Sequence, residues 1–126
     1  MIHERHYSLE QASAARTWVS ERLGSMREAL ERLGDEDARA ALEQLESSDA
    51  GGSYPGRPVA KALIDFQAAL SELEQMEIVV RDVERGLVDF PALREGEEVY
   101  LCWLEDEAEI GYWHRPDAGF AGRRAL

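Results

Sequence analysis

The sequence has only one cysteine, Cys102, in 126 residues, so no disulfide can form within the chain. It also has no apolar run that approaches the ~18 residues of a membrane-spanning helix. The first residues, MIHERHYSLEQ, lack the apolar segment of a secretory signal. Because proteins with so little cysteine are typical of reducing compartments, we expect a cytoplasmic protein.

Positive charge is also scarce. Lysine and arginine number 14 against 26 aspartate and glutamate residues, which gives a formal net charge of −12. Nucleic-acid binding without sequence preference needs basic residues aligned on one face, and docking on anionic membranes needs similar basic patches. The charge therefore argues against nucleic acids and membranes as partners, and it favours solubility.

The hydrophobic content of 44% is that of a globular protein rather than a disordered one. A chain of this length buries roughly two-thirds of the surface that its unfolded form exposes. We predict a single domain over residues 1–126. Its helical part covers 1–76, and a part formed by a β-hairpin and a tail covers 77–126.

The first half of the chain carries an apolar seam with helical spacing. Ser8 and Gln11 form a capping box that starts a helix. The apolar residues recur every seven positions, with others between them: Ala12, Val19, Leu23, Met26, Leu30 and Leu33. We expect a bend or short break at Gly34, with Asp35 capping a further segment. The two histidines before this helix, His3 and His6, are expected in a solvated N-terminal arm.

A loop over residues 47–58 separates this region from a second helix, which Pro58 starts. The apolar residues of the second helix repeat the spacing of the first: Val59, Leu63, Phe66, Leu70 and Leu73. Two seams of similar length joined through a turn predict an antiparallel helical hairpin or a small bundle.

The second half changes to the pattern of strands. The β-branched residues at 78–80 predict a strand near 77–83. Asp89 is expected to cap a short turn that Phe90 and Pro91 start and Gly96 closes. Two strand-like runs, VYLCWL and IGYWH, follow as a hairpin. The sequence therefore predicts an α+β fold, in which an antiparallel helical hairpin or small helical bundle is followed by a small antiparallel β-sheet of about three strands.

Four blocks of the second half, GLVDFPAL, VYLCW, IGYWH and GFAGR, resemble in order and spacing an uncharacterised prokaryotic family, the domain of unknown function 2203. The resemblance is strong from Gly86 to Arg123 and weaker through the helices. It implies a helical N-terminal half followed by this C-terminal signature. It implies no activity.

The candidate catalytic residues are Asp89, Cys102 and His114. A cysteine thiolate with a histidine base, oriented by an aspartate, is a nucleophilic arrangement. A two-residue turn at 106–107 would place Cys102 and His114 on opposite faces of the hairpin, whereas a three-residue loop with a bulge would place them on one face. A buried structural thiol is the commoner role of a free cysteine, and we favour it. These residues lack the closely spaced pairs of metal-binding motifs, so we predict no metal site.

The candidate ligand-binding residues are Trp103, Trp113, His114 and Arg123. Aromatic side chains that point outward beside His114 and Arg123 would form a contact patch. The segment GFAGRR is suited to an anion-binding nest, with its arginines supplying charge. We favour the alternative, in which Arg123 forms an internal salt bridge with Asp89 or with a glutamate of the hairpin.

These features predict a small acidic interaction module that forms a homodimer through its helices and uses no cofactor. The alternative is a small enzyme or ligand-binding protein with a site at Asp89, His114 and Arg123, with Cys102 or a metal as a further component. A protein partner and a small anionic ligand both remain open as partners. A concave pocket with converging polar groups favours the alternative, and a flat apolar helical face favours the module.

Overall fold

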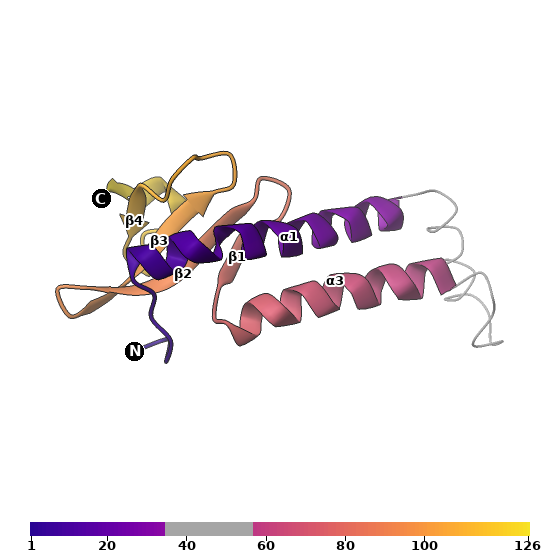
Figure 1. Cartoon of the computed structure of the whole chain (residues 1–126), viewed down its shortest axis with the longest axis horizontal. Helices are drawn as coiled ribbons and strands as arrows, with labels where there is room; N and C mark the ends of the chain where they lie inside the picture. Colours follow the sequence, from indigo (N-terminus) through magenta and orange to yellow (C-terminus); the bar gives the residue numbers. More distant parts are fainter. Residues whose placement is uncertain (35–56) are drawn as a thin grey trace.

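The computed structural model describes residues 1–34 and 57–126, and it shows two long helices side by side with a sheet at one end of them (Figure 1). Helix α1 spans Leu9–Gly34 and helix α3 spans Arg57–Gln75. The chain leaves the sheet along α1 and returns to it along α3, so the helices are antiparallel (Figure 1). The predicted α+β fold with a helical hairpin is confirmed. The segment that Asp35 was expected to cap, and residues 47–56 of the predicted loop, lie outside the described residues.

Both predicted helix signals are present in the structure. The amide of Ser8 donates to Oε1 of Gln11 at 2.9 Å, and the amide of Gln11 donates to Oγ of Ser8 at 3.0 Å, which is the capping box. The seams of the two helices meet in one core with the sheet, and these helical residues are buried: Ala12, Val19, Leu23, Met26, Ala69 and Leu73. Within the described ranges, no helix is both long and apolar enough to cross a membrane.

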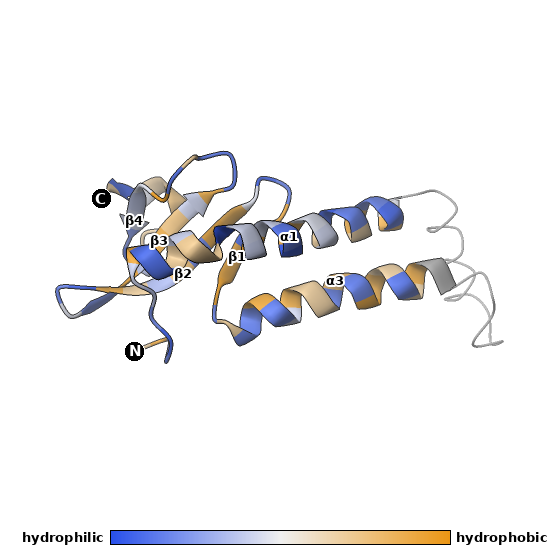
Figure 2. Cartoon of the chain, viewed as in Figure 1, coloured by the Kyte–Doolittle hydropathy of each residue, from blue (hydrophilic) through white to orange (hydrophobic). Residues whose placement is uncertain are grey.

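The sheet holds five antiparallel strands, each paired with the next along the chain. They are β1 (Val79–Asp82), β2 (Leu87–Arg94), β3 (Glu97–Leu104), β4 (Tyr112–His114) and β5 (Arg124–Ala125). The sheet has two strands more than the three expected from the sequence. The segment LVDFPALR forms β2, and the tail forms β5. In Figure 2 the strands are largely coloured as hydrophobic and the loops between them as hydrophilic.

The predicted turn after Asp89 is wrong, because β2 continues through Pro91. Pairing of β1 with β2 stops at Asp89, so the missing N–H of Pro91 lies at an open edge. The carbonyl of Pro91 accepts a hydrogen bond from the amide of Tyr7 at 2.7 Å. The turn falls instead at Glu95 and Gly96, whose φ angles of 54° and 80° fit a two-residue hairpin turn with both residues left-handed.

Alternation along the strands gives the sheet two different faces. One face packs on the helices and is apolar, and its buried residues are Val88, Phe90, Ala92, Val99, Leu101, Trp103 and Trp113. The opposite face carries Asp89, Tyr100, Cys102 and His114, all of them buried. Burying polar side chains costs free energy unless they are hydrogen-bonded. The second face, which carries the buried Asp89 and His114, is therefore the candidate location of a functional site.

The two histidines of the N-terminal arm are not solvated, which corrects the expectation for His3 and His6. Their side chains are only 12% and 16% exposed. The carboxylate of Glu98 accepts hydrogen bonds from the amides of Ile2 and His3 and from Nε2 of His6, at 2.8, 3.0 and 2.8 Å. The carboxylate of Glu77 accepts from the amide of Arg5 at 2.6 Å. Two glutamates of the second half thus fasten the first residues to the sheet.

Replacing Glu98 with glutamine is expected to remove a pH-dependent part of the stability. Burial acts to raise the pKa of Glu98, but the hydrogen bonds from His6 and from the two amides outweigh it and lower the pKa from 4.5 to about 2. A carboxyl whose pKa falls on folding stabilises the folded state above its unfolded pKa, and this contribution is lost as the pH falls toward 2. Thermal unfolding should therefore separate wild type from Glu98→Gln near neutral pH and bring them together in acid.

The control for this measurement is Glu97→Gln, since the Glu97 side chain is 67% exposed in its ion pair with Arg115. Exposed pairs contribute little to stability, so this variant should follow wild type at every pH. An equal effect of the two substitutions would contradict the role of Glu98.

Candidate functional site

Asp89, Cys102 and His114 lie on the three neighbouring strands β2, β3 and β4. Asp89 pairs directly with Cys102, and Tyr100 pairs with His114. Since residues two apart on a strand share a face, Cys102 and His114 lie on the same face. The loop that connects β3 and β4 covers residues 105–111. It is therefore longer than both the two-residue turn and the three-residue loop considered from the sequence. One side-chain ligand atom from each of the three residues lies within 4.8 Å of the others.

Asp89 and His114 form a buried pair. Nε2 of His114 lies 2.9 Å from Oδ2 of Asp89, and each side chain is 1% exposed. Nδ1 of His114 lies 2.8 Å from the carbonyl oxygen of Arg115. A carbonyl oxygen only accepts hydrogen bonds, so Nδ1 carries the proton of that bond and donates it to Arg115. These two bonds also fix the orientation of the imidazole ring.

Arg81 of β1 joins this pair, although it was not among the predicted site residues. Its Nε donates to Oδ2 of Asp89 at 2.9 Å, and its guanidinium lies over the Tyr100 ring. The only sign of this role in the sequence is the position of Arg81 within the predicted strand near 77–83. Oδ2 of Asp89 thus accepts two hydrogen bonds, whereas Oδ1 is buried and has no hydrogen-bond partner among the described residues. Leaving such an oxygen unpaired costs free energy unless a ligand pairs with it.

Cys102 is 1% exposed and presents its side chain to the same place. Burial raises the pKa of its thiol to about 12, and the neighbouring carboxylate of Asp89 adds to this effect. At neutral pH the group is a thiol, whereas a nucleophile would have to be a thiolate. The arrangement of Cys102 with His114 therefore lacks the activation that a catalytic cysteine requires.

A cavity of about 190 Å³ borders these groups. It is lined by Arg81, Leu87, Asp89, Cys102, His114, Gly119 and Phe120. Leu87 and Phe120 supply apolar walls, and the remaining side chains bring a guanidinium, a carboxylate, a thiol and an imidazole. Converging polar groups in a partly apolar cavity are typical of small-ligand sites.

Arg123 does not join Asp89 and His114. Its Nη2 donates to Oε1 of Glu107 at 2.6 Å and to the carbonyl of Cys102 at 3.3 Å. Its guanidinium stacks on the rings of Tyr112 and Phe120. This is the favoured alternative, an internal salt bridge with a glutamate of the hairpin. The amide of Arg123 donates within the tail, to the carbonyl of Phe120 at 3.1 Å, so it is not free for an anion.

The two tryptophans proposed as ligand contacts lie on the other face of the sheet. Trp103 and Trp113 are 3% and 7% exposed and belong to the hydrophobic core. Nε1 of Trp103 donates to the carbonyl of Glu107 at 3.0 Å, which satisfies its polar edge. The aromatic residue that borders the cavity is Phe120.

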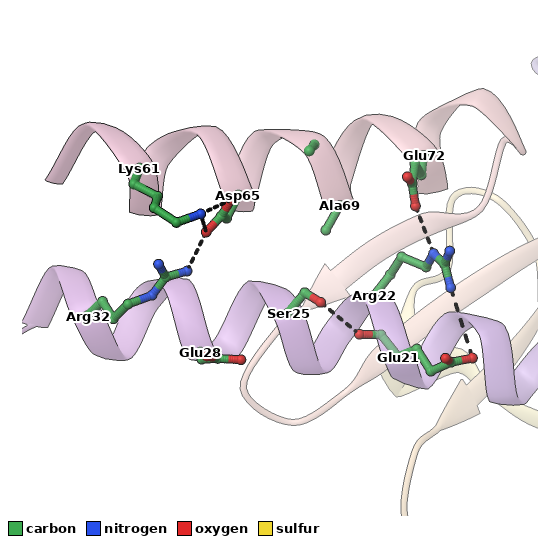
Figure 3. A pocket seen from close by; sticks show the side chains of 10 residues that line it. Glu21, Arg22, Ser25, Glu28, Arg32, Lys61, Asp65, Ala69 and Glu72 are labelled. Atoms are coloured by element: carbon green, nitrogen blue, oxygen red, sulfur yellow. Dashed lines mark hydrogen bonds and ion pairs between the residues drawn. The ribbon is translucent and has the colours of Figure 1, made fainter. Parts of the chain in front are cut away.

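A larger groove of about 550 Å³ lies between the helices α1 and α3 (Figure 3). Ion pairs cross it: Arg32 pairs with Asp65 and Arg22 with Glu72, each at 2.8 Å. The hydrogen bond from Arg32 lowers the pKa of Asp65. Because the lining is mostly charged and already paired, this groove is not a flat apolar face of the kind that an interaction through the helices would use.

Comparison with curated proteins and with solved structures found no match to this chain. Comparison with protein families found one, which is described as an uncharacterized conserved protein (DUF2203) and which matches residues 5–126. The match includes both helices of the described residues and the whole sheet, so it extends well beyond the four blocks of the second half. The chain belongs to the DUF2203 family of uncharacterised conserved proteins.

Proposed function

We propose that the protein binds a small ligand in the cavity beside Asp89, Cys102 and His114. The observation that carries this proposal is the buried oxygen Oδ1 of Asp89, which lacks a hydrogen-bond partner among the described residues. A native protein rarely leaves a buried carboxylate oxygen unpaired, and such groups are common where a ligand completes the site.

The chemistry of the cavity also indicates what kind of ligand fits. The unpaired group is a carboxylate oxygen, which seeks a hydrogen-bond donor or a positive charge. Arg81 and His114 are already bonded to Oδ2 of the same carboxylate. A cation or a small donor-bearing molecule is therefore favoured over the small anionic ligand that the sequence left open. The volume of about 190 Å³ restricts it to a small molecule, since a cavity of about 150 Å³ holds benzene.

A thermal-shift panel tests this proposal on the full chain. Small amines, guanidinium, amides and divalent metal ions form one group of probes, and phosphate, sulfate and acetate form the other. A ligand that binds the folded state alone at 100 times its Kd stabilises it by about 2.7 kcal/mol. We expect stabilisation by at least one probe of the first group and its loss in Asp89→Asn, which keeps the side-chain shape but removes the charge.

The matched control is Asp117→Asn, because Asp117 is exposed. This variant should respond to the same probe as wild type does. Stabilisation by anions alone, or an unchanged response in Asp89→Asn, would contradict the proposal.

A second proposal is the homodimer through the helices, which Leu63 and Ile64 of α3 support. These neighbouring apolar side chains are 50% and 66% exposed. A second copy of the chain would cover them. Light scattering at ~100 μM, above typical dissociation constants of specific dimers, should then give the mass of two chains, and Ile64→Glu should reduce it to one. The exposed Gln67 of the same helix provides the control Gln67→Glu. A monomeric wild type would remove this proposal.

A further inference from the structure

We infer that the ligand of this cavity is a divalent metal ion of the zinc class, held by Asp89, Cys102 and His114. The inference rests on the proposed function and names the ligand class. A carboxylate oxygen, a thiolate sulfur and an imidazole nitrogen are the three ligand types that zinc prefers.

The spacing of the three groups suits one ion. Their ligand atoms lie within 4.8 Å of one another. Metal–ligand bonds of about 2.0–2.3 Å in a tetrahedral site place ligand atoms about 3.3–3.8 Å apart. Side-chain adjustments of about an ångström would thus close the site, and the strands that carry the ligands need not move.

The imidazole of His114 is already oriented as a ligand. Metal-binding histidines commonly donate their other ring N–H to a backbone carbonyl or a carboxylate. Nδ1 of His114 donates to the carbonyl of Arg115 at 2.8 Å, which leaves Nε2 directed at Asp89. A metal ion would replace the proton between Nε2 and the carboxylate, and that proton would pass to solvent.

The charges also balance. Binding converts the Cys102 thiol to a thiolate, with its proton released to solvent, so two anionic ligands and one neutral imidazole face a divalent ion. A thiol that coordinates a divalent cation is deprotonated because the charge of the cation favours the thiolate. Arg81 bonds Oδ2 of Asp89 and would orient the carboxylate, as partners of metal ligands do.

Three protein ligands leave a fourth coordination position. Structural zinc sites are closed by four protein ligands, whereas three ligands with an open position are the pattern of sites that bind water or a substrate. The cavity beside Leu87, Gly119 and Phe120 lies next to the three ligands and provides the space for such a molecule.

Cobalt(II) is the probe for this inference, because it reports its ligands by absorbance. Untagged full-length protein is stripped with a chelator and titrated with Co²⁺. We expect one ion per chain, a thiolate-to-cobalt charge-transfer band in the near ultraviolet, and visible bands with the intensity of a tetrahedral site. Zn²⁺ should displace the cobalt and abolish these bands.

Variants locate the site. Cys102→Ser should abolish the charge-transfer band, and Asp89→Asn should lower the affinity for Co²⁺ by at least about 100-fold, since even the partners of metal ligands contribute 10–100-fold. The control is the double variant His3→Gln with His6→Gln, which removes the two histidines of the N-terminal arm and should leave the spectrum unchanged. Near-ultraviolet circular dichroism of the tryptophans confirms that each variant is folded.

Three results would overturn the inference: no charge-transfer band in wild type, a band that persists in Cys102→Ser, or its loss in the folded double variant. The proposed function fails separately. If Co²⁺ and Zn²⁺ do not bind but a small amine or amide stabilises wild type and not Asp89→Asn, the cavity is a ligand site and the metal inference alone is wrong.

Discussion

Replacing Arg123 with alanine is expected to lower the free energy of unfolding by about 2 kcal/mol, between the values of about 1 kcal/mol for an exposed ion pair and about 3–5 kcal/mol for a buried one. The side chains of Arg123 and Glu107 are 12% and 22% exposed, so the substitution leaves a poorly solvated carboxylate without its cation. It also removes the guanidinium that stacks on Tyr112 and Phe120. Urea denaturation followed by tryptophan fluorescence measures the loss.

The matched control is Arg115→Ala, which breaks an ion pair of the same types at the surface. The side chains of Arg115 and Glu97 are 50% and 67% exposed, so this loss should stay below about 1 kcal/mol. If Arg123→Ala proved as mild as this control while losing a bound ligand, Arg123 would belong to a binding site and not to the structure.

Replacing Phe90 with alanine should cost about 3–5 kcal/mol, which is typical of an aromatic side chain removed from a core. Phe90 is 0% exposed, and its ring forms a T-shaped pair with the Tyr7 ring at a centroid distance of 5.5 Å. The substitution leaves a cavity between the helices, the sheet and the start of the chain. Calorimetric unfolding of the purified variant measures this.

Phe120→Ala is the control of the same residue type. Phe120 is 38% exposed and borders the ligand cavity instead of the core. Its loss should cost less than about 1 kcal/mol of stability but should change the response to a ligand. A large destabilisation in Phe120→Ala with none in Phe90→Ala would show that Phe120, and not Phe90, belongs to the core.

The helical hairpin could be predicted from the sequence because two signals agree, the capping box and the repeated apolar spacing. In each helix, one contact falls one residue before the predicted position. Ala29 is fully buried beside the predicted Leu30, and Ala62 is fully buried whereas the predicted Leu63 is 50% exposed. The apolar spacing favoured the larger leucines, whereas a small alanine lies at each of these buried positions.

Strand β2 was not predicted from the sequence, because two local signals indicated a turn. Aspartate commonly caps turns, and proline is disfavoured inside a sheet. Both residues lie in a strand here because tertiary contacts decide the outcome: β1 stops pairing at Asp89, and Tyr7 bonds the carbonyl of Pro91. Sheet pairing between distant segments is not visible in a local window.

The candidate site was predictable in part. The sequence analysis named Asp89 and His114 as members of one site in the alternative function, and the structure places their side chains 2.9 Å apart. The length of the loop over 105–111 was not predictable from the sequence. This length sets the pairing register of β3 with β4, and the register places Cys102 and His114 on the same face of the sheet. Arg81 was missed, and Arg123 was expected in its place. Three potential metal ligands on three strands form no short motif, so spacing along the chain does not reveal them.

The helical hairpin extends well beyond the sheet, and this has a consequence for its dynamics (Figure 1). Helix α1 has 26 residues, or about 39 Å of length, and its residues Ala12, Val19, Leu23 and Met26 share the main core with the sheet. Near its other end, Leu33 packs on Val59 in a separate small cluster. Local opening requires less free energy where fewer apolar contacts must break. Amide hydrogen exchange should therefore be slowest near Val19 and become faster toward Leu33, so the domain unfolds from the tip of the hairpin inward.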